Sequence, residues 1–185
     1  ALSTLVERLR EPRRFIQVLG GPRQVGKTTM MRQAAGVLSI PTHYASADDP
    51  GLRDLGWLRA QWEVGRQLAL PRAAGAALLI LDEIQKVPGW SDLVKLLWDE
   101  DTAAGRQLKA VVLGSAPLLM ARGLSESLAG RFELLRISHW SLPEMRDAFG
   151  WDLDTFVYFG GYPGAVPLTS DRTRWARYIL DSLVE

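Results

Sequence analysis

Apolar positions along this chain fall into short continuous runs and into longer stretches where they recur every three or four residues. The short runs predict β-strands and the longer stretches predict amphipathic helices. The predicted strands lie at 15–19, 44–47, 77–81, 109–113 and 132–137. The predicted helices lie within 1–14, at 27–37, at 52–70, from a Ser91 cap through Leu97, and at 118–129. Strands separated by helices of about ten or more residues indicate βαβ crossovers and therefore a parallel sheet.

The pattern changes after Ser138, where helical segments replace strands. Helices are predicted at 141–149, at 153–159 and from 172 to the end, with a glycine-rich turn at 160–164. We therefore expect an α/β core over residues 1–137, followed by a helical segment over 138–185. Because the first residue is not Met and the last helix is still running at Glu185, we expect this sequence to be a piece of a longer protein.

Composition excludes several classes of protein. The 185 residues, 47% apolar and 23% charged, are typical of one folded globular domain. The longest apolar run covers 73–81, whereas a membrane span needs about 20 residues. The chain has no cysteine, which excludes disulfides, a thiolate nucleophile and Cys-ligated zinc. No export leader opens the sequence, so we expect a cytoplasmic protein with no membrane partner.

Charge is unevenly distributed behind a net value of +1. The first 35 residues carry seven basic and two acidic side chains. Such a segment could contact nucleic acid or a phosphate ligand. Two of the seven basic residues lie inside a phosphate-binding motif, which favours the phosphate ligand.

That motif is G-x-x-x-x-G-K-[ST], matched at every specified position between a predicted strand and a predicted helix. Glycines allow the backbone to curl so that its N–H groups point at phosphate oxygens. Lys27 is expected to reach the β- and γ-phosphates, and the hydroxyl of Thr28 to bind Mg²⁺. The predicted nucleotide-binding residues are Gly21, Pro22, Arg23, Gln24, Val25, Gly26, Lys27, Thr28 and Thr29.

Two acidic residues, Asp82 and Glu83, follow the buried strand at 77–81. Ligands bind at the carboxyl ends of strands in open α/β sheets. Asp82 is expected to hold Mg²⁺ through water, and Glu83 to orient and deprotonate a water for attack on the γ-phosphate. The alternative is a solvated pair that caps a helix.

Two further candidates lie near the ends of later strands. Ser115 follows the fourth strand, where its hydroxyl could hold the attacking water or contact the γ-phosphate; otherwise it is an ordinary helix cap. Arg131, just before the fifth strand, could supply positive charge to phosphoryl transfer or form a surface salt bridge. Arg122 is the weaker candidate for that charge.

The adjacent Asp-Glu pair separates the classes of nucleotide-binding protein. A GTPase would carry an Asn-Lys-x-Asp motif, which is absent, and the signature of an ABC ATPase is not found before the acidic pair. A small-molecule kinase has no use for a water-activating carboxylate beside its metal. Hydrolysis of ATP is therefore favoured.

These motifs resemble those of the prokaryotic AAA-type (AAA+-like) P-loop ATPases whose full-length members carry a C-terminal domain of unknown function. The resemblance rests on the phosphate loop, on Leu-Asp-Glu-Ile-Gln-Lys at 81–86, on Gly-Ser-Ala with Gly-Arg-Phe at 114–132, and on Gly-Gly-Tyr-Pro at 160–163. It implies a three-layer α/β/α fold with strand order 5-1-4-3-2 and a helical lid after residue 138. It also implies that Ser115 is sensor 1 and Arg131 an arginine finger.

The sequence departs from this family at two places. Ser115 is followed by Ala116 and Pro117 where the family often has further serines, and Gly164 stands where the family often has Glu. The first departure keeps the sensor hydroxyl, and the second removes a polar group from the lid.

Two functions follow from these expectations. The first is a Mg²⁺-dependent ATPase that couples nucleotide state to a conformational change, active as a homo-oligomer if Arg131 acts on a neighbouring chain. The second is a nucleotide-dependent switch that hydrolyses little ATP and recruits DNA or protein through a C-terminal region outside this sequence. Glu83 favours the first, because a pure switch does not need it.

Overall fold

The computed structural model describes residues 1–48, 51, 54–69, 75–115 and 127–183. They form two compact units, one made of 1–20 with 28–136 and the other of 21–27 with the residues from 137 onward. The phosphate loop is therefore grouped with the C-terminal segment. The expected division into an ATPase core over 1–137 and a helical lid over 138–185 stays a prediction. Most of the predicted helix at 118–129 lies outside the described residues, as does Arg122.

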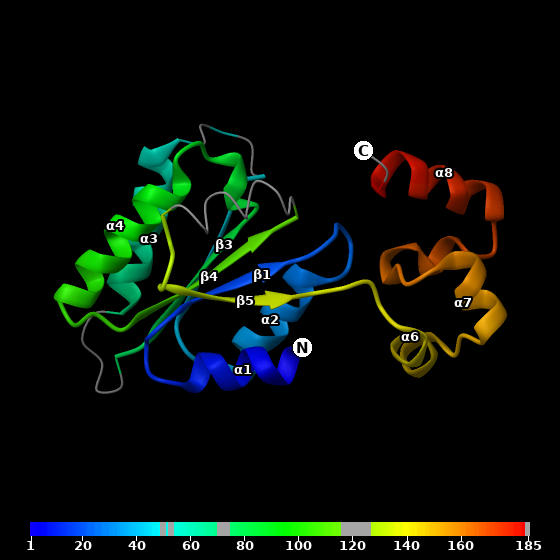
Figure 1. Cartoon of the computed structure of the whole chain (residues 1–185), viewed down its shortest axis with the longest axis horizontal. Coiled ribbons are helices and arrows are strands. Elements are labelled where there is room, and N and C mark those ends of the chain that lie inside the picture. The colour runs from blue at the N-terminus through cyan, green and yellow to red at the C-terminus, as the bar shows by residue number, and fades with distance from the viewer. Residues whose placement is uncertain (49–50, 52–53, 70–74, 116–126, 184–185) are drawn as a thin grey trace. The chain divides into compact units, whose positions relative to one another are not determined.

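The first unit is a parallel sheet with helices on both faces (Figure 1). Its elements are α1 (Leu2–Arg10), β1 (Ile16–Gly20), α2 (Lys27–Leu38), β2 (Thr42–Ser46), α3 (Leu55–Leu68), β3 (Ala77–Asp82), the 3₁₀ turn η1 (Ile84–Lys86), α4 (Trp90–Ala103), β4 (Leu108–Gly114) and β5 (Phe132–Arg136). The strands are ordered β2-β3-β4-β1-β5, and every neighbouring pair is parallel. The expected order 5-1-4-3-2 and the three-layer α/β/α fold of P-loop NTPases are confirmed.

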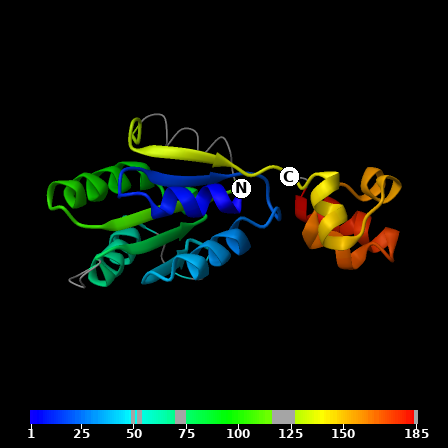
Figure 2. The ribbon, with the colours of Figure 1, turned by 90° about the horizontal axis from the view of Figure 1, so that it is seen from below.

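Successive residues of a strand point to opposite faces of the sheet. Both faces are buried, because helices pack against each of them. On one face, Leu79 and Val112 share a core with Trp62 of α3 and Leu97 of α4. On the other, Ile80 and its neighbours pack against α1 and α2. The strand arrows share one direction in Figure 2, so the carboxyl ends of β1, β3 and β4 meet at one edge of the sheet.

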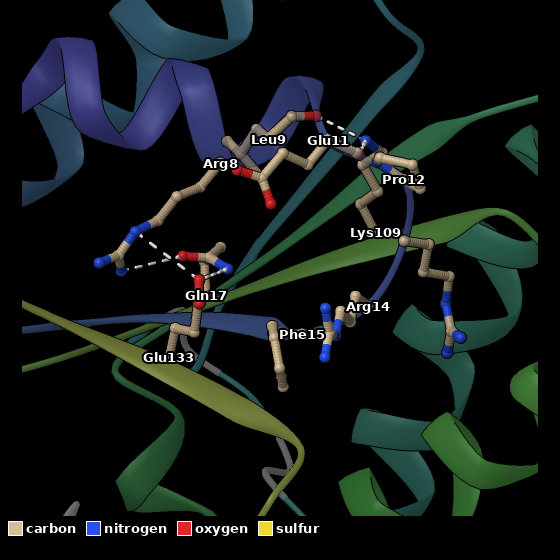
Figure 3. A pocket seen from close by; sticks show the side chains of 10 residues that line it. Arg8, Leu9, Glu11, Pro12, Arg14, Phe15, Gln17, Lys109 and Glu133 are labelled. Atoms are coloured by element: carbon tan, nitrogen blue, oxygen red, sulfur yellow. Dashed lines mark hydrogen bonds and ion pairs between the residues drawn. The ribbon is translucent and has the colours of Figure 1, made fainter.

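The C-terminal end of α1 is fixed to the sheet by Lys109 of β4. Its ammonium donates hydrogen bonds to the carbonyl oxygens of Leu9, at 2.6 Å, and of Glu11, and burial lowers the pKa of Lys109. Gln17 Nε2 of β1 donates a hydrogen bond to Glu133 Oε2 of β5 at 3.0 Å. Lys109, Gln17 and Glu133 line a small hollow beside α1 (Figure 3). A cation on the last carbonyls of α1 complements the negative end of the helix dipole.

The expected helix cap at Ser91 is wrong. α4 begins at Trp90 and its N-cap is Gly89, so Ser91 lies inside the first turn, where it is buried. Gly89 has φ +74°, a left-handed conformation that glycine adopts without a steric penalty. The chain therefore turns into α4 at this glycine and needs no side-chain cap.

The second unit contains α6 (Leu142–Phe149), α7 (Leu153–Phe159), the 3₁₀ helix η2 (Pro163–Leu168) and α8 (Arg172–Leu183). The sequence predicted the three α-helices but not η2. Met145, Trp151 and Phe159 form the buried core, with Trp175 packed against it. Across the described part of the chain, every helix is too short or too polar to cross a membrane.

Candidate functional site

The phosphate loop runs from Gly21 to Lys27, with α2 beginning at its last residue. Gln24 and Gly26 have φ values of +61° and +91°, and these two left-handed residues curl the backbone. Lys27 is buried, and its Nζ donates hydrogen bonds to the carbonyl oxygens of Gly21 at 2.8 Å and Pro22 at 2.6 Å. The loop thus folds around its own ammonium group, as expected of a cradle for phosphate.

Gly21 is required at the start of the loop for steric reasons. A Cβ at this position would lie 2.1 Å from the carbonyl oxygen of Ile137. Any other residue would therefore push the loop away from the segment that follows β5. This close approach is a second reason for the first glycine of the motif, besides the turn itself.

Asp82, at the end of β3, accepts hydrogen bonds from three groups. Its Oδ2 accepts from the hydroxyls of Thr28 and Tyr44, each at 2.8 Å, and its Oδ1 accepts from the backbone N–H of Glu83 at 2.9 Å. Only 6% of Asp82 is exposed. Burial, together with the hydrogen bond to Asp82, raises the pKa of Tyr44 to about 12. The Thr28 hydroxyl and the Asp82 carboxylate are oxygen ligands of the kind that Mg²⁺ prefers, so this pair fits that ion.

Glu83 has an unusual backbone conformation for a non-glycine residue, with φ +52° and ψ +34°. Its Oε2 accepts hydrogen bonds from Ser115 Oγ at 2.9 Å and from Gln85 Nε2 at 2.5 Å. Because β3 and β4 pair in parallel, the residues that follow them leave the sheet at the same edge. The Glu83 side chain makes no capping hydrogen bond, which argues against the helix-capping alternative.

Arg131 lies at a different edge of the sheet from Asp82 and Ser115, since it precedes β5 and those residues end β3 and follow β4. Its guanidinium forms two hydrogen bonds to Asp99, Nε–Oδ1 at 2.8 Å and Nη2–Oδ2 at 2.9 Å. This pairing raises the pKa of Arg131 and lowers the pKa of Asp99. A role for Arg131 in catalysis stays a prediction.

The structure thus places the predicted site residues in separate groups. Residues 21–27 lie in the second unit. Within the first unit, hydrogen bonds link Thr28 to Asp82, Asp82 to Glu83, and Glu83 to Ser115. Thr29 is exposed on α2. Sequence reasoning missed Tyr44, and it quoted Gln85 within a motif without giving it a role.

Comparisons with known proteins bear on the family and the fold of this chain. A family model described as an AAA domain matches residues 13–146. The uncharacterized proteins Rv2008c of Mycobacterium tuberculosis and Mb2031c of Mycobacterium bovis are each 30% identical over 172 residues, which is 92% of this chain and 35% of theirs. The chain therefore spans about a third of the length of these curated relatives.

Among solved structures, the chain is similar to the RuvB Holliday junction branch migration motor of Thermotoga maritima. The TM-score is 0.56 at 22% identity, over 79% of this chain and 46% of that one. A point variant of the same protein gives the same values. At 22% identity, this similarity shows that the two proteins share a fold.

Proposed function

This chain belongs to the AAA domain family, and we propose that it is a Mg²⁺-dependent ATPase that couples the nucleotide state to a conformational change. Two features of the chain support this function: the phosphate loop, which would bind the β- and γ-phosphates, and the acidic residues after β3.

The phosphate loop would hold the nucleotide, and the residues that open α2 and end β3 would hold the metal. The loop N–H groups and the Lys27 ammonium would contact the phosphates. Thr28 and Asp82 would hold Mg²⁺, the first directly and the second through water. Bound there, the ion would neutralise charge on the β- and γ-phosphate oxygens.

The orientation of Glu83 is the single observation that carries hydrolysis. Its Oε2 is held by Ser115 and Gln85, whereas Oε1 accepts no hydrogen bond from the part of the chain that the structure describes. Oε1 would take a proton from a water as the water oxygen bonds to the γ-phosphorus. The bond from that phosphorus to the β–γ bridging oxygen then breaks, which gives ADP and inorganic phosphate.

Steady-state ATP hydrolysis by Glu83→Gln tests this role. Loss of the base should lower the rate about 10²–10⁴-fold, while binding of a fluorescent ATP analogue stays within about twofold of wild type. Glu7→Gln is the matched control, since Glu7 is exposed on α1. Wild-type turnover by Glu83→Gln would refute the base. Tight binding of ATP without turnover by the wild-type chain would favour the nucleotide-dependent switch.

A further inference from the structure

The phosphate loop is held from outside by two aromatic side chains of the C-terminal segment, within the second unit. Trp140 Nε1 donates a hydrogen bond to the carbonyl oxygen of Val25 at 3.1 Å. The hydroxyl of Tyr178, on α8, hydrogen-bonds to Gln24 Oε1. Two consecutive residues in the middle of the loop are therefore anchored by residues more than 100 positions away in the sequence.

The Trp140 contact determines which way a loop N–H points. In a trans peptide the carbonyl oxygen and the following N–H point in opposite directions, and the chain has no cis bonds among its described residues. Since the Val25 carbonyl is directed at the indole, the N–H of Gly26 is directed away from it. Backbone N–H groups are the phosphate ligands of such a loop, so Trp140 orients one of them.

Trp140 is itself rigidly placed. Its backbone N–H donates to the carbonyl oxygen of Gly161 at 3.1 Å, and a Cβ at Gly161 would lie 2.0 Å from the Trp140 oxygen. Its ring stacks on Phe149, with centroids 5.9 Å apart. The indole is therefore anchored to the fold of the second unit, and it can hold the loop against that fold.

Tyr178 supports a residue whose backbone is in an unfavourable conformation. Gln24 has φ +61°, a region that non-glycine residues seldom occupy. Gly164 lies beside this bond, since a Cβ there would be in ordinary van der Waals contact with both partners, 3.4 Å from Gln24 Oε1 and 3.5 Å from the Tyr178 hydroxyl.

We propose that Trp140 and Tyr178 are positioning residues, together a loop clamp, that set the phosphate loop for nucleotide binding and link its phosphate occupancy to α8. The inference rests on the proposed function, since it requires that the loop bind nucleotide phosphates. Binding at the loop and the position of α8 are then reciprocally coupled through two hydrogen bonds.

Amide hydrogen exchange of the chain with and without Mg²⁺-ADP tests the clamp. ADP should slow exchange in α8 by about 2- to 10-fold, the effect of roughly one net hydrogen bond. Tyr178→Phe should abolish this change and weaken ADP binding by a similar factor. Tyr158→Phe is the matched control on α7, since its hydroxyl has no hydrogen bond to a described residue, and it should behave as wild type.

Trp140→Phe gives an independent second test, because it removes the indole N–H and keeps an aromatic ring against Phe149. It should also weaken ADP binding about 2- to 10-fold and uncouple α8 from ADP. Thermal unfolding of each variant establishes that it is folded.

The outcomes separate the clamp from the proposed function. ADP binding with unchanged α8 exchange in the wild-type chain overturns the clamp alone. So does a folded Tyr178→Phe variant that keeps the full response of α8. If the wild-type chain binds neither ADP nor ATP, the proposed function fails and the clamp fails with it.

Discussion

At the scale of single residues, the carboxylate of Asp82 organises the acidic site. It brings together the hydroxyls of Thr28 and Tyr44 from two different elements. The Tyr44 phenol is a donor in this arrangement, and its pKa of about 12 keeps it protonated at neutral pH. Tyr44 therefore belongs to this site, where it helps to hold Asp82 in place beside α2.

The raised pKa of Tyr44 makes stability dependent on pH in the alkaline range. An unfolded tyrosine titrates near 10, so between about pH 10 and 12 the folded chain binds more protons than the unfolded chain. The contribution of Tyr44 is fully present below pH 10 and is lost as pH rises through 12. We expect urea unfolding to show a smaller loss of stability from pH 9.5 to 11.5 in Tyr44→Phe than in wild type.

Tyr162→Phe is the control for this experiment, because the Tyr162 hydroxyl has no hydrogen bond to a described residue. It should retain the wild-type dependence on pH. If the free energy of unfolding fell equally with pH in Tyr44→Phe and in wild type, Tyr44 would not contribute to the pH dependence of stability.

At the scale of elements, α3 and α4 are joined by a buried carboxylate. Asp101 is fully buried and accepts hydrogen bonds from Trp62 Nε1 at 2.8 Å, Arg66 Nε at 2.7 Å and Arg106 Nη1 at 3.2 Å. Buried charge is tolerated only when it is paired and hydrogen-bonded. The two helices that cover one face of the sheet are thus locked at the edge away from Asp82 and Glu83.

Asp101→Ala should be strongly destabilising, because it leaves the buried Trp62 N–H without its acceptor and removes the fully buried one of the three carboxylates that pair with Arg66. Breaking a buried ion pair costs about 3–5 kcal/mol, which denaturant unfolding would detect. Asp147→Ala, at an exposed position on α6, should change stability by less than about 0.5 kcal/mol. If Asp101→Ala lowered the free energy of unfolding by less than about 1 kcal/mol, the hydrogen bonds of Asp101 would not be what locks α3 to α4.

At the scale of the whole molecule, the proposed ATP hydrolysis would require positive charge at the edge of the sheet where Glu83 lies. Arg131 precedes β5, and Ser115 follows β4, so a strand length on the order of 15 Å separates the two edges. Arg131 is already paired with Asp99 of its own chain. If Arg131 serves catalysis, we expect it to act on a neighbouring chain in a homo-oligomer, after release from Asp99.

Mixing two inactive variants tests this arrangement. Arg131→Ala should lower ATP turnover by about 10³-fold or more if it removes an arginine finger, and Glu83→Gln would remove the proposed base. When the two are mixed, the Arg131 of one chain can serve the intact Glu83 of the other, so activity should reappear and rise with protein concentration.

The control mixture pairs Glu83→Gln with Arg146→Ala, an exposed position on α6. In it, turnover should come from the Arg146→Ala chain with or without its partner. Activity of the first mixture that never exceeds the sum of the separate variants would exclude a finger in trans.

Sequence by itself determined the parts of this protein that depend on neighbouring residues. The phosphate loop follows from glycine spacing and from the lysine and threonine that open α2, all within eight positions. The strands followed from short apolar runs, because a strand buried on both faces must be apolar throughout. Strand order came only from the resemblance of motifs, since hydrophobic pattern carries no information on which strands pair.

Tertiary structure decided which side chains hold those parts in place. Tyr44 reaches Asp82 across 38 positions, Trp140 reaches Val25 across 115, and Tyr178 reaches Gln24 across 154. None of these pairs leaves a local pattern, because a tyrosine or tryptophan that packs has the same sequence signature as one that donates a hydrogen bond. The chemistry of the phosphate loop is therefore local, whereas the contacts that orient it depend on the folded chain.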